Sequence, residues 1–135
     1  MTARSGILKL SLVALAAVIW TAAPTQATGL IWKTLTLANG WKVYPGTRHP
    51  AYTIDANNFV HLRGGMFTAG TNAMAFTLPV GFRPNQNVYV VTVAINAKPA
   101  QLVITTEGIV NVQAGVNQTD VYNFTSLEGI NFVTR

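Results

Sequence analysis

Alternating apolar and polar residues run through the chain after residue 29 in short segments that are separated by turn residues. A two-residue period is that of a strand with one buried face, and no stretch after residue 29 sustains a helical period. The expected strands follow one another at roughly 8–12 residues, a spacing typical of sandwiches and jelly rolls. The sequence therefore predicts an all-β fold, an antiparallel β-sandwich or jelly roll of about ten short strands.

Turn residues divide this pattern at places where strand pairing can be predicted. Residues 31–37 alternate and stop before Asn39-Gly40, a strong hairpin signal that joins them to the next strand. Glu107-Gly108 separates two apolar segments and predicts another hairpin, whereas residues 55–58 are typical of a polar turn. The last two expected strands are residues 121–127 and 130–133.

The longest expected strand covers residues 88–95. Its alternate positions form one face of Tyr89, Val91, Val93 and Ile95, and another of Val88, Val90, Thr92 and Ala94. Both faces are largely apolar, a pattern typical of a central strand that is covered on both sides. The alternative is a strand that buries one of its faces in a contact between subunits.

The first 27 residues have the pattern of a secretory signal peptide. Arg4 and Lys9 supply basic residues, residues 10–20 are apolar, and cleavage is expected after Ala27, with Ala23 as an alternative. The apolar run is shorter than the ~20 residues that span a bilayer, although a retained anchor is the alternative to cleavage. We therefore expect a signal-peptide helix at 1–27, a single β-sandwich domain at 28–135, and no membrane anchor after cleavage.

Charge and cysteine content narrow the function classes. Charged residues make up 10% of the chain, and removing the signal reduces the net charge from +5 to +3, with the basic residues scattered. Nucleic-acid binding needs a concentrated basic patch, so we do not expect it. With no cysteine, the domain has to be stabilised by its core or by oligomerisation. Export without disulfides favours a secreted bacterial protein.

A series of motifs extends over nearly all of residues 32–133. The most specific are Val-His-Leu-Arg-Gly at 60–64 and Leu-Pro-Val-Gly-Phe-Arg-Pro at 78–84. The others are Trp32, Leu37-x-Asn39-Gly40-Trp41, Ala51-Tyr52, Ile104-x3-Gly108 and Leu127-x-Gly129-Ile130-x-Phe132. Together they resemble the receptor-binding head or tip domains of phage tail-fibre and baseplate proteins, and related modules of bacterial secreted proteins. The resemblance implies a compact β-sandwich, often trimeric, whose loops or inter-subunit clefts bind a cell-surface saccharide or another polymer.

Two features depart from the phage pattern. Phage tail proteins are assembled in the cytoplasm without a signal peptide, and the shaft or baseplate-attachment segment expected before a tip domain is missing. The chain therefore looks like an exported bacterial relative, which puts a role in a virion in doubt.

Four residues are candidate ligand contacts. In the segment 59–65, alternation directs Val60 and Leu62 to the core, and His61 and Arg63 to the other face. Those two side chains either form a polar outer face, or Arg63 donates paired hydrogen bonds to a carboxylate or to vicinal hydroxyls, with His61 beside it.

Aromatic side chains supply the other two candidates. Trp32 shares its expected strand face with Thr34 and Thr36, away from the apolar stripe, and Tyr44 ends the following strand. Aromatic rings stack on sugars but also fill cores, and Trp41, directly after the Asn-Gly turn, is expected to be a core residue.

Catalysis has little support. The titratable residues after the signal that we weigh as acids or bases are His49, Asp55, His61, Glu107, Asp120 and Glu128. Glu107 and Glu128 stand beside glycines in expected turns, where solvent would keep their pKa values ordinary, and we expect no metal, cofactor or catalytic residue. The sequence thus predicts a secreted, non-enzymatic recognition module, homotrimeric, that binds a glycan or cell-envelope polymer. The alternatives are a structural, self-assembling subunit of an exported or phage-tail-like particle, and a small hydrolase that uses Asp55 and Asp120.

Overall fold

The computed structural model describes residues 29–135, so the predicted signal peptide lies outside the described residues. Eleven strands in this part of the chain form three antiparallel sheets. Sheet A has the order β1 (Lys33–Thr34), β3 (Ala51–Ile54), β4 (Phe59–Arg63) and β11 (Asn131–Val133). Sheet B has the order β10 (Thr125–Ser126), β5 (Gly65–Thr68) and β2 (Trp41–Val43). Sheet C has the order β6 (Met74–Thr77), β9 (Ile109–Ala114), β8 (Pro99–Ile104) and β7 (Val88–Val93).

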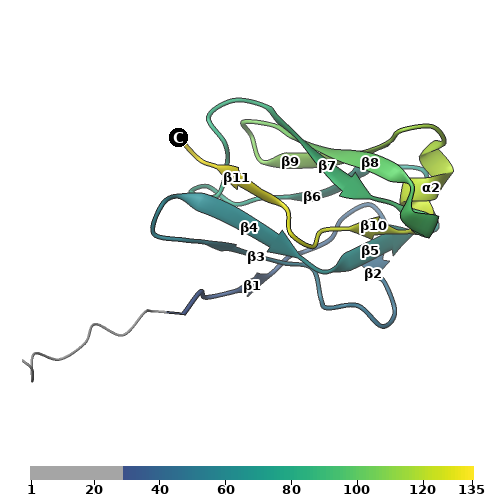
Figure 1. Cartoon of the computed structure of the whole chain (residues 1–135), viewed down its shortest axis with the longest axis horizontal. Helices are drawn as coiled ribbons and strands as arrows, with labels where there is room; N and C mark the ends of the chain where they lie inside the picture. The colour runs from purple at the N-terminus through teal and green to yellow at the C-terminus, as the bar shows by residue number, and fades with distance from the viewer. Residues whose placement is uncertain (1–28) are drawn as a thin grey trace, which may run out of the picture.

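The sheets are stacked in two layers, with sheet C over sheets A and B (Figure 1). Both layers contribute buried apolar side chains to one core, among them Val60, Leu62, Met66, Phe76, Leu102, Ile104, Val110 and Val112. The predicted all-β antiparallel sandwich is therefore confirmed. None of the helices within residues 29–135 has the length and apolar character needed to span a bilayer.

Gly64 bends the lower layer where sheet A becomes sheet B. It lies between β4 and β5 with a φ of +106°, a backbone conformation that side-chain-bearing residues rarely adopt. A Cβ at this position would lie 2.6 Å from the backbone nitrogen of Pro50. Only glycine therefore fits here, and the bend carries the chain from one sheet of the layer into the next.

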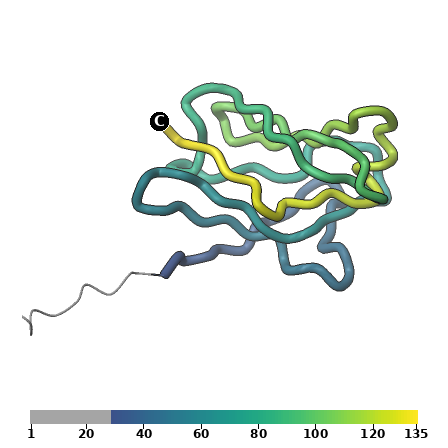
Figure 2. The backbone as a smooth tube through the Cα atoms, viewed as in Figure 1, coloured from purple at the N-terminus to yellow at the C-terminus, as the bar shows by residue number. Residues whose placement is uncertain are grey.

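The C-terminal segment runs beside β4 along this layer, as the tube in Figure 2 shows. The backbone amide of Leu127 donates to the carbonyl oxygen of Gly64, and β11 pairs with β4 so that Asn131 is opposite His61. The end of the chain thus closes the sheet whose outer face carries the candidate residues of β4.

Pairing of the predicted hairpins was only partly right. Residues 39–40 form a turn in which both residues have positive φ, as expected for Asn-Gly. However, β1 pairs with β3 and β2 pairs with β5, so the predicted hairpin across this turn is wrong. The hairpin across Glu107-Gly108 is confirmed, because β8 and β9 are adjacent and antiparallel.

The longest apolar strand does not lie in the centre of its sheet. β7 pairs with β8 and stands at the edge of sheet C, with Tyr89, Val91 and Val93 exposed. The predicted central position, covered on both sides, is therefore wrong. One of its two apolar faces packs on the core, and the other is exposed.

A short helix replaces part of an expected strand. Residues 121–127 were expected to be extended, but α2 (Gln118–Asn123) occupies their first half and β10 follows it. The side chain of Asn117 caps this helix by accepting a hydrogen bond from the amide of Thr119. With six residues, the helix is too short to show a helical period in the sequence.

Candidate functional site

The alternation of β4 places its polar side chains on the outer face of sheet A. Val60 and Leu62 are buried in the core, whereas His61 and Arg63 are half-buried on the opposite face. The antiparallel register puts His61 beside Thr53 of β3 and Asn131 of β11. The predicted alternation of this segment is therefore confirmed.

Arg63 is stacked on Trp32, which directly precedes β1. The guanidinium carbon of Arg63 lies 4.2 Å from the centroid of the Trp32 ring, within the range of a cation–π contact. Its Nε is buried and makes no hydrogen bond within residues 29–135. This contact occupies one face of the indole. The donors of Arg63 that could reach a ligand are the N–H groups at the end of the guanidinium.

His61 is held by the turn that precedes β4. Its Nε2 donates to Oδ2 of Asp55 at 2.8 Å, while Oδ1 of Asp55 accepts the backbone amides of Asn57 and Phe59. The hydrogen bond from His61, followed by the one from the Phe59 amide, lowers the pKa of Asp55 below its ordinary value. Asp55 is thus an anchor for the turn and for the imidazole.

A second carboxylate lies near the other end of this face. Glu128 accepts hydrogen bonds from both Nε and Nη2 of Arg48, and from the backbone amide of Gly64 at 3.0 Å. The Arg48 hydrogen bond is the main reason that the pKa of Glu128 is lowered, and the charge of Arg63 adds to the effect. The prediction that solvent keeps this pKa ordinary is wrong.

Tyr44 lies apart from the other three candidates. Its ring packs edge-to-face on Phe67 at 5.9 Å and on Phe124 at 4.8 Å between ring centroids, at one end of sheet B. The structure therefore brings Trp32, His61 and Arg63 to one surface and places Tyr44 at another. Trp41 is buried, with its Nε1 donating to the carbonyl oxygen of Asn72, which confirms its predicted core position.

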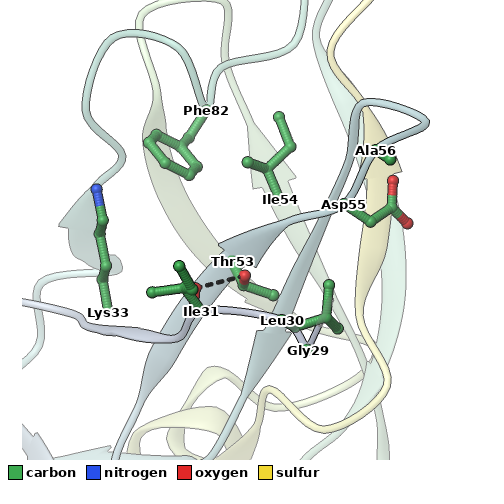
Figure 3. A pocket seen from close by; sticks show the side chains of 9 residues that line it. All are labelled: Gly29, Leu30, Ile31, Lys33, Thr53, Ile54, Asp55, Ala56 and Phe82. Carbon is green, nitrogen blue, oxygen red and sulfur yellow. Dashed lines mark hydrogen bonds between the residues drawn. The ribbon is translucent and has the colours of Figure 1, made fainter. Parts of the chain in front are cut away.

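A cavity of about 340 Å³ opens beside β3 (Figure 3). Phe82 and Ile54 form its apolar wall, and the ammonium of Lys33 lies 5.3 Å from the centroid of the Phe82 ring. The hydroxyl of Thr53 donates to the carbonyl oxygen of Ile31, so it is already bonded. The lining therefore offers few polar groups that could fix the orientation of a ligand.

The outer face of sheet C is a third surface. The structure contradicts the predicted cover on both sides of β7, whereas the alternative, a contact between subunits, stays a prediction. Tyr89, Val91 and Val93 are 66%, 79% and 45% exposed and form a ridge along β7. Next to this ridge, Pro99, Gln101 and Gln113 line a shallow groove of about 310 Å³. The alternation of residues 88–95 indicates that the outward side of this strand is apolar, but it does not indicate that the strand lies at the edge of its sheet.

Within residues 29–135, no group of three or more histidine or acidic side chains is placed to hold a metal ion. Asp120, buried at the start of α2, accepts a hydrogen bond of 3.4 Å from Nζ of Lys98. Asp55 and Asp120 each have their own basic partner, His61 and Lys98.

No protein-family model matches the chain, and no curated protein matches it. Among solved structures, the chain is similar to the receptor binding protein (gp15) of Listeria phage PSA. The two share 20% sequence identity with a TM-score of 0.62, over 100% of this chain and 80% of the phage chain. The predicted resemblance to phage receptor-binding domains is thereby confirmed at the level of the fold.

Proposed function

We propose that the protein is a recognition module that binds a cell-surface saccharide or another polymer of the cell envelope, without catalysing a reaction. The observation that carries the proposal is the fold, which is similar to that of a protein named for receptor binding. One fold hosts many functions, so the proposal also needs a surface with suitable chemistry. The outer face of sheet A, with Trp32, His61 and Arg63, supplies it.

Arg63 is suited to this role because its guanidinium is already oriented. The contact with Trp32 restrains the guanidinium, so less conformational freedom is lost when it donates to vicinal hydroxyls or to a carboxylate. His61, two residues earlier on the same face, is fixed by Asp55. Such a surface favours shallow contacts along a polymer over enclosure of a small substrate.

The positions of the carboxylates favour binding over hydrolysis. A general acid must be protonated near neutral pH, whereas the pKa of Asp55 and that of Glu128 are both lowered by their hydrogen bonds. Asp120 is paired with Lys98 beside α2. These lowered pKa values argue against Asp55 and Glu128 as general acids, which supports the proposal of binding without cleavage. The proposal includes export from a bacterial cell, for which residues 1–27 are the predicted signal.

Binding to purified envelope polysaccharides, measured by surface plasmon resonance, tests this proposal. We expect Arg63→Gln to weaken binding about tenfold or more, since a charge-assisted hydrogen bond contributes roughly 1.5–3 kcal/mol. Lys42→Gln removes one positive charge from exposed Lys42 of β2 and should leave affinity unchanged. Equal affinities for the Arg63→Gln and native proteins, with equal melting temperatures, would contradict the role of this surface.

The second candidate function is assembly, for which the ridge of β7 is the specific observation. The outward side chains of β7 to β9 pair in rows, Tyr89 with Val103 and Asn111, Val91 with Gln101 and Gln113, and Val93 with Pro99. None of them is charged, so copies of this positively charged chain could meet here without repulsion. We propose that this face forms the contact of a homotrimer, which light scattering over a concentration series would detect.

A further inference from the structure

A shallow, open depression of about 340 Å³ lies between the turn after β2, the end of β7 at Val93, the 3-10 turn η1 (Ile95–Ala97) and the end of α2. Tyr44 and Phe124 form its aromatic wall, with their ring centroids 4.8 Å apart and their planes at 65°. We call it the Tyr44 cavity. Its volume is within the range of small-molecule sites, which start at roughly 300 Å³.

The lining of the Tyr44 cavity is neutral. Its residues are aromatic, aliphatic or polar without charge, and the side chains that carry polar groups are those of Tyr44, Thr47 and Asn96. The hydroxyl of Thr47 already donates to the carbonyl oxygen of Tyr44 at 2.8 Å. The hydroxyl of Tyr44 and the carboxamide of Asn96 are left to meet a ligand.

The backbone of η1 presents Asn96 in an unusual conformation. Asn96 and Ala97 have φ values of 56° and 59°, and two consecutive left-handed residues without a glycine are uncommon. Hydrogen bonds from the Ala94 amide to Lys98 O, at 2.8 Å, and from the Lys98 amide to Ile95 O hold the turn. Strain of this kind persists where the surrounding structure fixes it, and it is concentrated at ligand sites.

We propose that the Tyr44 cavity binds one uncharged sugar residue of the polymer, as a second contact separate from the Arg63 surface. This inference rests on the proposed function. The C–H face of a pyranose ring packs on aromatic rings, and its hydroxyls can pair with the Asn96 carboxamide and the Tyr44 hydroxyl. An acidic sugar finds no opposite charge in the lining, because the ammonium of nearby Lys98 is bonded to Asp120.

The inference is tested on the full chain by binding to neutral and acidic envelope polysaccharides, each immobilised separately. Tyr44→Ala should weaken binding of the neutral polysaccharide about tenfold, from loss of ring packing and of a hydrogen bond. Asn96→Asp keeps the size of the side chain and its tolerance of the left-handed conformation, but replaces the N–H donors of the carboxamide with a carboxylate that can only accept hydrogen bonds, and should weaken it similarly. Asn39→Asp, at another exposed left-handed asparagine, breaks the hydrogen bond from the Asn39 carboxamide to the Met74 carbonyl oxygen, so it is the control for a loss of stability away from the cavity. It should bind as the native protein does, even if its melting temperature falls.

Tyr44→Phe, which removes only the hydroxyl, and a melting curve for each variant separate loss of binding from loss of folding. If Tyr44→Ala and Asn96→Asp bind normally while Arg63→Gln does not, the Tyr44 cavity is not a sugar site, and the proposed function still stands. If the native protein binds no polysaccharide, both ideas fail. Displacement of the neutral polysaccharide by laurate instead of by free hexose would overturn the inference in favour of an acyl-chain site.

Discussion

The outer faces of sheets A and C differ in whether their side chains find interaction partners within the chain. On and around sheet A, charged groups have partners within the chain, as Asp55 with His61, Glu128 with Arg48, and Arg63 with Trp32. On sheet C, the outward rows of β7 to β9 contain no charged residue, and the apolar side chains of β7 are exposed to solvent. Sheet A orders its polar groups beside two moderately exposed apolar residues, Phe59 and Val133, whereas sheet C has a neutral outer face with a longer and more exposed apolar ridge.

This difference is the physical basis of the two proposed roles of the domain. A surface whose polar groups are already held in place can recognise a polar ligand with little loss of conformational freedom. A neutral apolar face gains free energy only when another surface covers it, and large exposed apolar patches mark such contacts. The proposed recognition role therefore concerns sheet A and the proposed assembly role sheet C, and the two proposals can be tested separately.

The largest expected effect comes from Gly64, since the bend at this residue joins the recognition face to sheet B. Gly64→Ala should lower the free energy of unfolding by about 3 kcal/mol or more, from backbone strain together with the clash against Pro50. Gly129→Ala is the matched control, because its φ is also positive but a Cβ there would meet no atom within 4 Å. It should cost only about 1 kcal/mol.

Urea unfolding of the two variants measures both effects. A loss at Gly64 no larger than the loss at Gly129 would show that the lower layer can rearrange around the added methyl group, so that the bend is not a fixed element of the recognition face.

The next effect concerns the ridge of β7. Val91→Lys adds a charge to the outward face of sheet C and should raise the dissociation constant of the proposed trimer about tenfold or more. Val80→Lys, in the loop between β6 and β7, is the control, because Val80 is 81% exposed and lines neither the ridge nor the groove of sheet C. Sedimentation equilibrium measures both variants, and a native protein that stays monomeric at every concentration would refute the assembly role of sheet C.

The sequence predicts the parts of this architecture that depend on neighbouring residues. Alternation places Val60 and Leu62 inside and His61 and Arg63 outside, and Glu107-Gly108 identifies its hairpin, because side-chain period and turn chemistry are local properties. The Asn39-Gly40 turn lies between β1 and β2, yet β1 pairs with β3, and this pairing is not a local property. It depends on which strands bury the most apolar area together, and no short segment records that choice.

The candidate sites show the same limit. Outward orientation of Arg63 follows from alternation, but its contact with Trp32 joins residues 31 positions apart. Glu128 bonds to Arg48, 80 positions earlier in the chain, so the residues next to Glu128 in the sequence do not reveal its partner. The left-handed conformation of Ala97 has no signal in the sequence at all, since alanine is not a residue that favours it.

The smallest expected effect tests whether the charged groups of sheet A stabilise the fold through their pairing. The pKa of Glu128 is lowered in the folded protein, so its pairing contributes stability that is fully present above the pKa of the unfolded chain. This contribution is lost as the pH falls through the lowered pKa. The side chains of Arg48 and Glu128 are 63% and 43% exposed, so solvent screening keeps the effect smaller than those at Gly64 and Val91.

Glu128→Gln should therefore remove part of the loss of stability on the acid side, and the part that depends on Asp55 should remain. Urea midpoints measured between pH 7 and pH 3 in low salt follow this difference, and 0.5 M NaCl should reduce it. Glu107→Gln, in the β8–β9 turn of sheet C, is the control, because Glu107 makes no ion pair within residues 29–135. Its acid-side profile should match that of the native protein. Parallel acid profiles for Glu128→Gln and the native protein would mean that the pair of Glu128 and Arg48 is ordered without stabilising the fold.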